Sequence, residues 1–167
     1  VCRRTLAGHA MQVRVPADLP LIQLDAVLME RLLANLFENA AKYTPRDSSL
    51  SIHAAVEQQS GERYVRVCVD DNGPGLPAGI QQTLFDKFTR GEKESAKPGI
   101  GLGLAICRAI VEAHGGKIGA ENRVDGEGKV LGARFWFTLP ADQAPPFEAL
   151  PDENGDGPEA AAHTNTP

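Results

Sequence analysis

This 167-residue sequence lacks a long hydrophobic run, a leader segment and any metal-like cysteine spacing. A membrane-spanning helix needs about 20 mostly apolar residues, and no stretch of this chain approaches that length. No charged-then-apolar leader opens the chain either, so we expect neither a membrane anchor nor a signal peptide in it. The three cysteines, Cys2, Cys68 and Cys107, are odd in number and widely spaced, which indicates reduced thiols in a cytoplasmic protein.

A basic surface is also lacking. The formal net charge is −5, and residues 141–167 carry six acidic side chains and no Lys or Arg. Removing those six negative charges leaves the rest of the chain at about +1, so neither a nucleic-acid surface nor a membrane-binding face is indicated. The Pro, Ala, Gly and acidic composition of that segment predicts disorder.

The composition allows one domain, because 42% of the residues are hydrophobic and can form a core. We divide the chain into a lead-in at residues 1–10, a domain at 11–140 and an acidic tail at 141–167. Because the first residue is Val1 rather than methionine, we expect a fragment of a longer protein.

The hydrophobic pattern predicts a mixed α/β domain. Helical spacing marks residues 26–43, with Asp25 as the N-cap, and residues 102–114. Between them lies a short apolar piece at 80–88. Alternating or β-rich runs predict strands at 11–15, 21–24, 49–56, 63–70, 117–122 and 133–140. Neighbouring strands are close enough in sequence to form hairpins, which favours a mixed sheet covered by helices on one face.

Polar side chains line one face of the first helix. Asn35, Glu38, Asn39 and Lys42 are separated by helical offsets of three and four, opposite the leucines. An ordinary solvated helix face would explain such a stripe. The alternative is a phosphate site, because Asn oxygens suit Mg²⁺ and Lys supplies a positive charge.

The segment "DDNGPG" follows the strand at 63–70 and includes a carboxylate, Asp71, at the strand end. Gly73 and Gly75 permit a sharp turn with exposed backbone, which any turn would need. A carboxylate there could also accept a hydrogen bond from the exocyclic amine of adenine, which guanine lacks at the equivalent position. That second interpretation predicts selection of ATP over GTP.

The segment "KPGIGLGLAICRAIVEAHGG" contains Gly99, Gly101 and Gly103 and leads directly into a helix. The spacing does not fit a dinucleotide-binding fingerprint, because Leu104 stands where the third glycine belongs and no strand precedes it. A Walker-type loop fails too, since Ile118 follows Lys117. What remains is a glycine-hinged lid that closes over phosphates at a helix N-terminus.

Taken together and in this order, four segments resemble the ATP-binding catalytic domain of bacterial sensor histidine kinases. "NLFENAAKYTP" looks like the N box of that family, "DDNGPG" like its G1 box, "LFDKFTRG" like its F box and "GIGLGLAI" like its G2 box. One box is a weak signal, but four with correct spacing are specific. The stretch 88–116 is especially similar to the potassium-responsive sensor kinases that control a high-affinity potassium-uptake ATPase.

The resemblance implies the fold shared with DNA gyrase, the heat-shock-90 chaperones and the mismatch-repair ATPases. That fold is an α/β (α+β) two-layer sandwich, a mixed and mostly antiparallel sheet of about five strands packed on three helices, with a flexible ATP lid. The implied ligands are ATP and Mg²⁺.

The resemblance also implies roles on the first helix. Asn39 should contact Mg²⁺, with Asn35 on the phosphate side and Lys42 meeting phosphate. Tyr43 should lie against the nucleotide, and Glu38 is the candidate base or water-orienting group beside the γ-phosphate.

For the remaining motifs, Asp71 should hold the adenine amine, and Gly73 and Gly75 should shape the pocket. The lid backbone should meet the phosphates through Gly99, Gly101, Leu102 and Gly103. Arg90 should stabilise the transferring phosphoryl group or dock a partner domain. One departure concerns Gly132, which Ala133 follows where many family members have a hydroxyl residue.

An acceptor histidine in an H-E-[LF]-x-[TS]-P-like motif is absent from the sequence. The resemblance therefore implies a separate dimerisation and phospho-acceptor domain of the same kinase and a response regulator as partners. It also implies a membrane-anchored parent with this domain on the cytoplasmic side.

Two other functions stay open at this point. One is an ATPase that couples ATP binding to conformational change, although such enzymes place a glutamate base where this chain has Asn35. The other is a regulatory module that binds nucleotide without chemistry.

Overall fold

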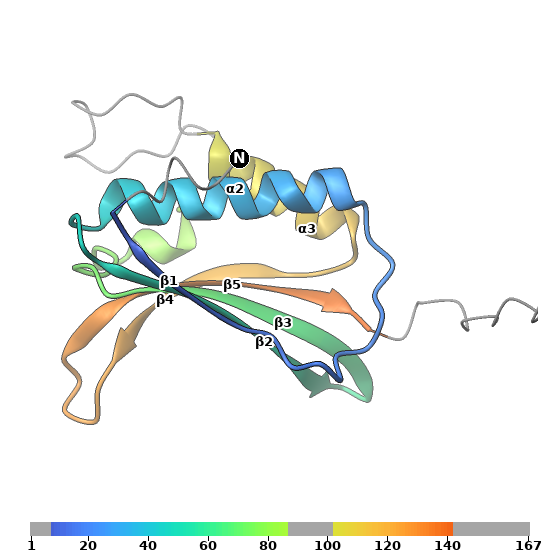
Figure 1. Ribbon diagram of the computed structural model, residues 1–167. Coiled ribbons are helices and arrows are strands. Elements are labelled where there is room, and N and C mark those ends of the chain that lie inside the picture. The colour runs from blue at the N-terminus through green and yellow to red at the C-terminus, as the bar shows by residue number, and fades with distance from the viewer. Residues whose placement is uncertain (1–7, 87–101, 142–167) are drawn as a thin grey trace, which may run out of the picture.

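A computed structural model describes residues 8–86 and 102–141 (Figure 1). Five strands form one sheet in the order β1-β2-β3-β5-β4. Their bounds are β1 Ala10–Arg14, β2 Ser49–Gln59, β3 Glu62–Asp71, β4 Ile118–Val124 and β5 Val130–Pro140. Only the β1–β2 pair is parallel. The predicted mixed, mostly antiparallel sheet is therefore confirmed.

Two α-helices, α2 (Ala26–Tyr43) and α3 (Gly103–Ala113), lie on the same side of the sheet (Figure 1). Asp25 caps α2 as the sequence predicts, because its Oδ1 accepts hydrogen bonds from the backbone N–H groups of Val27 at 2.9 Å and Leu28 at 3.0 Å. The described residues also contain the 3-10 turn η1 (Ile80–Gln82).

The predicted strand at residues 21–24 is wrong, because the chain there has no regular secondary structure. Leu21 and Leu24 are exposed, and only Ile22 packs against the core. The expected hairpin partner, β1, pairs instead in parallel with β2, and among the described residues no strand adds to its outer edge. The short apolar alternation therefore serves to anchor the connection into α2 through one side chain.

The core lies between the helices and one face of the sheet. Its buried residues include Leu32 and Leu36 from α2, Val111 from α3 and Phe135 and Phe137 from β5. Side chains alternate between the two faces of a strand, so Asp71 lies on the helix-facing side with Val69, while Asp70 lies on the opposite, open face.

Candidate functional site

The polar face of α2 holds a buried donor, the amide of Asn35, that has no oxygen or nitrogen acceptor among the described residues. Asn39 donates from its Nδ2 to the main-chain oxygen of Asn35 at 2.9 Å. The Nδ2 of Asn35 is itself buried, and no oxygen or nitrogen acceptor of the described residues lies within hydrogen-bonding distance. A buried polar atom without a partner carries a free-energy cost, so this amide is a natural contact for a bound acceptor.

The N-terminus of α3 lies beside Asn35. A Cβ added to Gly103 would lie 3.6 Å from the Asn35 Oδ1. The N-cap residue, Leu102, makes no side-chain cap hydrogen bond, and the first turn of α3 contains no acidic residue. The first N–H groups of a helix lack intrahelical partners and carry the positive end of its dipole. These groups and the Asn35 amide together favour an anion.

Asp71, at the end of β3, is the buried carboxylate on the helix-facing side of the sheet. Its Oδ1 accepts hydrogen bonds from the backbone N–H groups of Gly73 at 2.8 Å and Ala133 at 3.1 Å. Ala133 stands where many family members have a hydroxyl residue. Its backbone N–H nevertheless donates a hydrogen bond to the Asp71 carboxylate directly.

Two glycines let the backbone approach closely around Asp71. Gly132 has a φ of +142°, and a Cβ there would lie 2.0 Å from the main-chain oxygen of Asp71. Gly75 has a φ of +80°, and its Cβ would lie 2.5 Å from the Val130 Cγ1. Neither position accepts a side chain without local rearrangement.

Asn122 is a site residue that the sequence reasoning missed. Its Oδ1 accepts from the N–H of Leu76 at 2.6 Å, and its Nδ2 donates to the oxygen of the same residue at 3.0 Å. This amide fixes the loop after Asp71. A polar residue in the alternation of Ile118 and Ala120, on the helix-facing side of β4, was the signal that could have revealed it.

The α2 helix contacts both ends of this region. A Cβ on Gly73 would lie 2.8 Å from the Cγ2 of Thr44, just after α2, whereas Asn35 lies beside Gly103. Nine residues of helix separate these two contacts, which is about 13 Å at 1.5 Å per residue. The region therefore has an acidic end at Asp71 and an anion-attracting end at α3.

Other predicted residues occupy the same helix or lie outside the described residues. The Nζ of Lys42 lies 4.8 Å from the centre of the Tyr43 ring, and Glu38 is exposed. Gly99, Gly101 and Arg90 fall in 87–101, outside the part of the chain that is described.

The segment before residue 87 is fixed to α3. Phe85 is buried in the core, and Asp86 accepts a hydrogen bond from the Nη1 of Arg108 at 2.9 Å. Asp86 and Leu102, the described residues on either side of 87–101, therefore both lie at α3.

Within residues 8–86 and 102–141, no three His, Cys, Asp or Glu side chains form a group that could hold a metal ion. Among the same residues, no helix is long and apolar enough to cross a membrane.

The fold and site define a class of protein: an α/β domain in which helices cover one face of a mixed sheet, with a buried carboxylate and a helix N-terminus that has no side-chain cap on the covered side. The particular family follows from comparison with known proteins. The model of the histidine kinase-, DNA gyrase B- and HSP90-like ATPases matches residues 24–143, and the chain belongs to this family.

Relatives of known class are sensor kinases. The chain is 50% identical over 143 residues to the sensor protein KdpD of Escherichia coli (strain K12). The aligned region covers 86% of this chain and 15% of KdpD. It is 38% identical to the adaptive-response sensory kinase SasA of Synechocystis sp., over 75% of this chain and 31% of SasA. The chain thus spans under a third of either relative.

Solved structures agree with this assignment. The mycobacterial sensor histidine kinase MprB superposes with a TM-score of 0.69 at 26% identity, covering 83% of this chain and 87% of that one. Full-length ShkA in complex with AMPPNP gives a TM-score of 0.67 at 28% identity, covering 84% and 28%. The chain is therefore an ATP-binding catalytic domain of the sensor histidine kinase type, similar to that of KdpD.

Proposed function

We propose that this domain binds Mg²⁺-ATP and transfers its γ-phosphoryl group to a histidine on a separate dimerisation domain of the same kinase. The observation that carries the proposal is the buried Asn35 amide, whose Nδ2 has no oxygen or nitrogen acceptor among the described residues, beside the start of α3, which has no side-chain cap. In a family of ATPases, that arrangement fits phosphate oxygens.

The adenine end would lie at Asp71. Its Oδ1 is used by two backbone N–H groups, so the carboxylate has a fixed orientation. The exocyclic amine of adenine is a donor that matches this acceptor, which supports a preference for ATP over GTP.

The phosphate end would lie along α2 and at the start of α3. Asn35, Lys42 and the backbone at Leu102 and Gly103 would hold phosphate oxygens, and Asn39 would hold Mg²⁺ together with them. The lid glycines, Gly99 and Gly101, belong to the same proposal. Bound Mg²⁺ would neutralise charge that builds up on the phosphates.

The chemistry that this chain supplies is mainly positioning and charge neutralisation. An amide at Asn35 cannot take a proton from water, which favours transfer to a histidine over hydrolysis. Glu38 is the proposed proton acceptor or orienting group on the exposed side of α2, and Arg90 is proposed to stabilise the phosphoryl group or contact the acceptor domain.

The identity of 50% to KdpD supports potassium or osmotic signalling through a response regulator, in a parent protein that is membrane-anchored with this domain on the cytoplasmic side. These are properties of the parent and rest on the likeness.

The experiment uses γ-labelled ATP with Mg²⁺, the chain alone, and the chain with a helix-hairpin acceptor fragment of a related sensor kinase. We expect acid-labile label on the acceptor histidine and almost none on the chain. Asn39→Ala should abolish transfer, and Glu30→Ala, at an exposed position of the same helix, should leave it unchanged.

Strong labelling of the chain alone would contradict the proposal. Steady phosphate release without acceptor would instead favour the ATPase alternative.

A further inference from the structure

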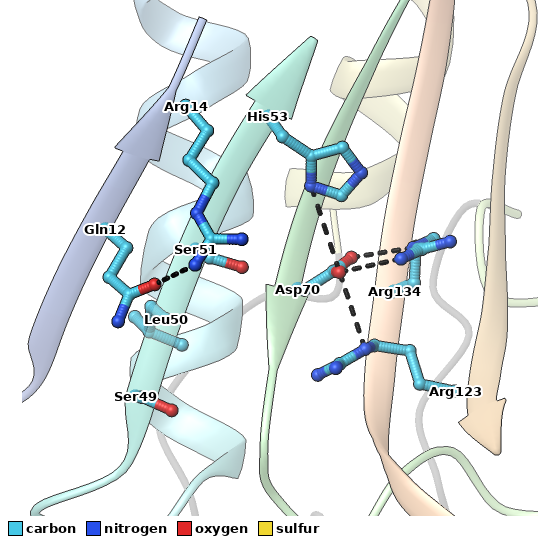
Figure 2. Close-up of a pocket in the computed structure, with 9 residues that line it drawn as sticks. All are labelled: Gln12, Arg14, Ser49, Leu50, Ser51, His53, Asp70, Arg123 and Arg134. Carbon is cyan, nitrogen blue, oxygen red and sulfur yellow. Dashed lines mark hydrogen bonds and ion pairs between the residues drawn. The ribbon is translucent and has the colours of Figure 1, made fainter. Parts of the chain in front are cut away.

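The open face of the sheet carries a buried carboxylate directly behind the proposed adenine site. Asp70 has only 5% of its surface exposed. Arg134 donates to it from two nitrogens, Nε to Oδ1 and Nη2 to Oδ2, both at 2.8 Å (Figure 2). This bidentate contact raises the pKa of the Arg134 guanidinium above its ordinary value, so the guanidinium stays charged.

Arg123 joins this cluster to the backbone of the next residue. Its Nε lies 3.4 Å from the Asp70 Oδ2, and its Nη1 donates to the main-chain oxygen of Asp71 at 2.9 Å. One guanidinium thus contacts the side chain of Asp70 and the backbone of Asp71.

The strand geometry explains how Arg123 reaches so far. Arg123 is on β4, and β5 lies between β4 and β3. Its partner on β5 is Gly132, which has no side chain, and the ladder is irregular directly after Arg123. Such irregularities redirect side chains. A Cβ on Gly132 would approach the same Asp71 oxygen that Arg123 contacts.

A hollow of about 490 Å³ on this face is lined by arginines and by polar side chains such as Ser49, Ser51 and Gln12 (Figure 2). The positive charge of these arginines would favour binding of an anion. However, Arg134 and Arg123 direct donors at Asp70 and at the Asp71 backbone, so the cluster is built around the end of β3 and not around a ligand.

We propose that Arg123 and Asp70 are positioning residues that orient the Asp71 carboxylate from behind and thereby set the selectivity for adenine. The proposal rests on the proposed function, since it requires Asp71 to contact the base. Neither residue touches the nucleotide, because Asp71 faces the helices and this cluster faces the opposite side.

The test measures dissociation constants for Mg²⁺-ATP and Mg²⁺-GTP by calorimetry on the full chain. Arg123→Ala should weaken ATP by about 5-fold, the equivalent of one hydrogen bond, and should change GTP much less. The ratio of the GTP to the ATP dissociation constant therefore falls. Asp70→Asn should lower the ratio in the same direction, because a neutral amide holds Arg123 less firmly.

The matched control is Arg14→Ala. Arg14 lines the same hollow but donates to Gln12 at 2.9 Å, so its loss should leave both constants unchanged. Circular dichroism checks that each variant is folded. If Arg123→Ala does not fold, Arg123→Lys takes its place, since an ammonium cannot bridge both oxygens as a guanidinium does.

An unchanged ATP-to-GTP ratio in a folded Arg123 variant overturns the proposal, as does an equal loss of both nucleotides. Failure of the unaltered chain to bind ATP would instead refute the proposed function.

Discussion

Replacing Asp71 with asparagine tests the placement of the base most directly. The change keeps the size of the side chain and its Oδ1, which can still accept from the N–H groups of Gly73 and Ala133. The second oxygen becomes an NH₂ group. A donor would then face the amine of adenine, which is also a donor.

The expected magnitude follows from one lost hydrogen bond and one buried donor left unpaired. Such a group costs about 1–3 kcal/mol, which corresponds to an ATP affinity about 5- to 150-fold weaker. Guanine presents an oxygen where adenine has its amine, so affinity for GTP should stay level or improve. A reversal of preference is the specific signature of the proposed contact.

Calorimetric titration with Mg²⁺-ATP and Mg²⁺-GTP measures both effects. Asp18→Asn, at an exposed position between β1 and α2, makes the same change in charge and should bind like the unaltered chain. If Asp71→Asn folds normally and binds ATP as tightly as before, the base does not contact this carboxylate and the orientation of the nucleotide is wrong.

Two further predictions concern stability. Gly75→Ala forces a Cβ to within 2.5 Å of the Val130 Cγ1 at a φ of +80°, so we expect about 1–3 kcal/mol of destabilisation in urea unfolding, and unchanged stability would refute the close approach. Burial raises the pKa of the Cys107 thiol to about 12 from its ordinary 9.0, against the smaller opposing effect of the Asn35 amide. The fold therefore favours the neutral thiol, and this stabilisation is complete below pH 9 and is lost as the pH rises toward 12, by up to about 4 kcal/mol. Unfolding at pH 8 to 11 should show a steeper alkaline loss than in Cys107→Ala, and equal slopes would contradict the assignment.

Local patterns account for most of what could be predicted from the sequence. The α2 helix and its Asp25 cap follow from periodicity and capping chemistry, and both hairpins follow from strands that are neighbours in the chain. The strands β1 and β2 pair in parallel although the whole of α2 separates them in the chain, so no local sequence pattern indicates this pairing. The run at 21–24 has the composition of a strand, but only Ile22 of it packs against the core, and the run leads directly into α2.

The site shows the same division between local and distant information. Asp71 was found because its neighbours form a recognisable turn motif. Asn122 and Arg123 are more than 50 residues further along the chain and act through β4, so their roles appear only once the strand order is known.

The adjacent residues Asp70 and Asp71 show why the strand register, which the sequence alone does not reveal, decides the role of each carboxylate. In sequence the two carboxylates are equivalent, and a shift of one residue in strand register would exchange them. The pairing of Asp70 with Arg134 and of Asp71 with Leu50 fixes the register. One carboxylate then meets arginines on the open face, and the other points toward the helices. In the proposed function Asp71 accepts a hydrogen bond from the base, and the register leaves its carboxylate available for this, because the arginines contact Asp70 instead.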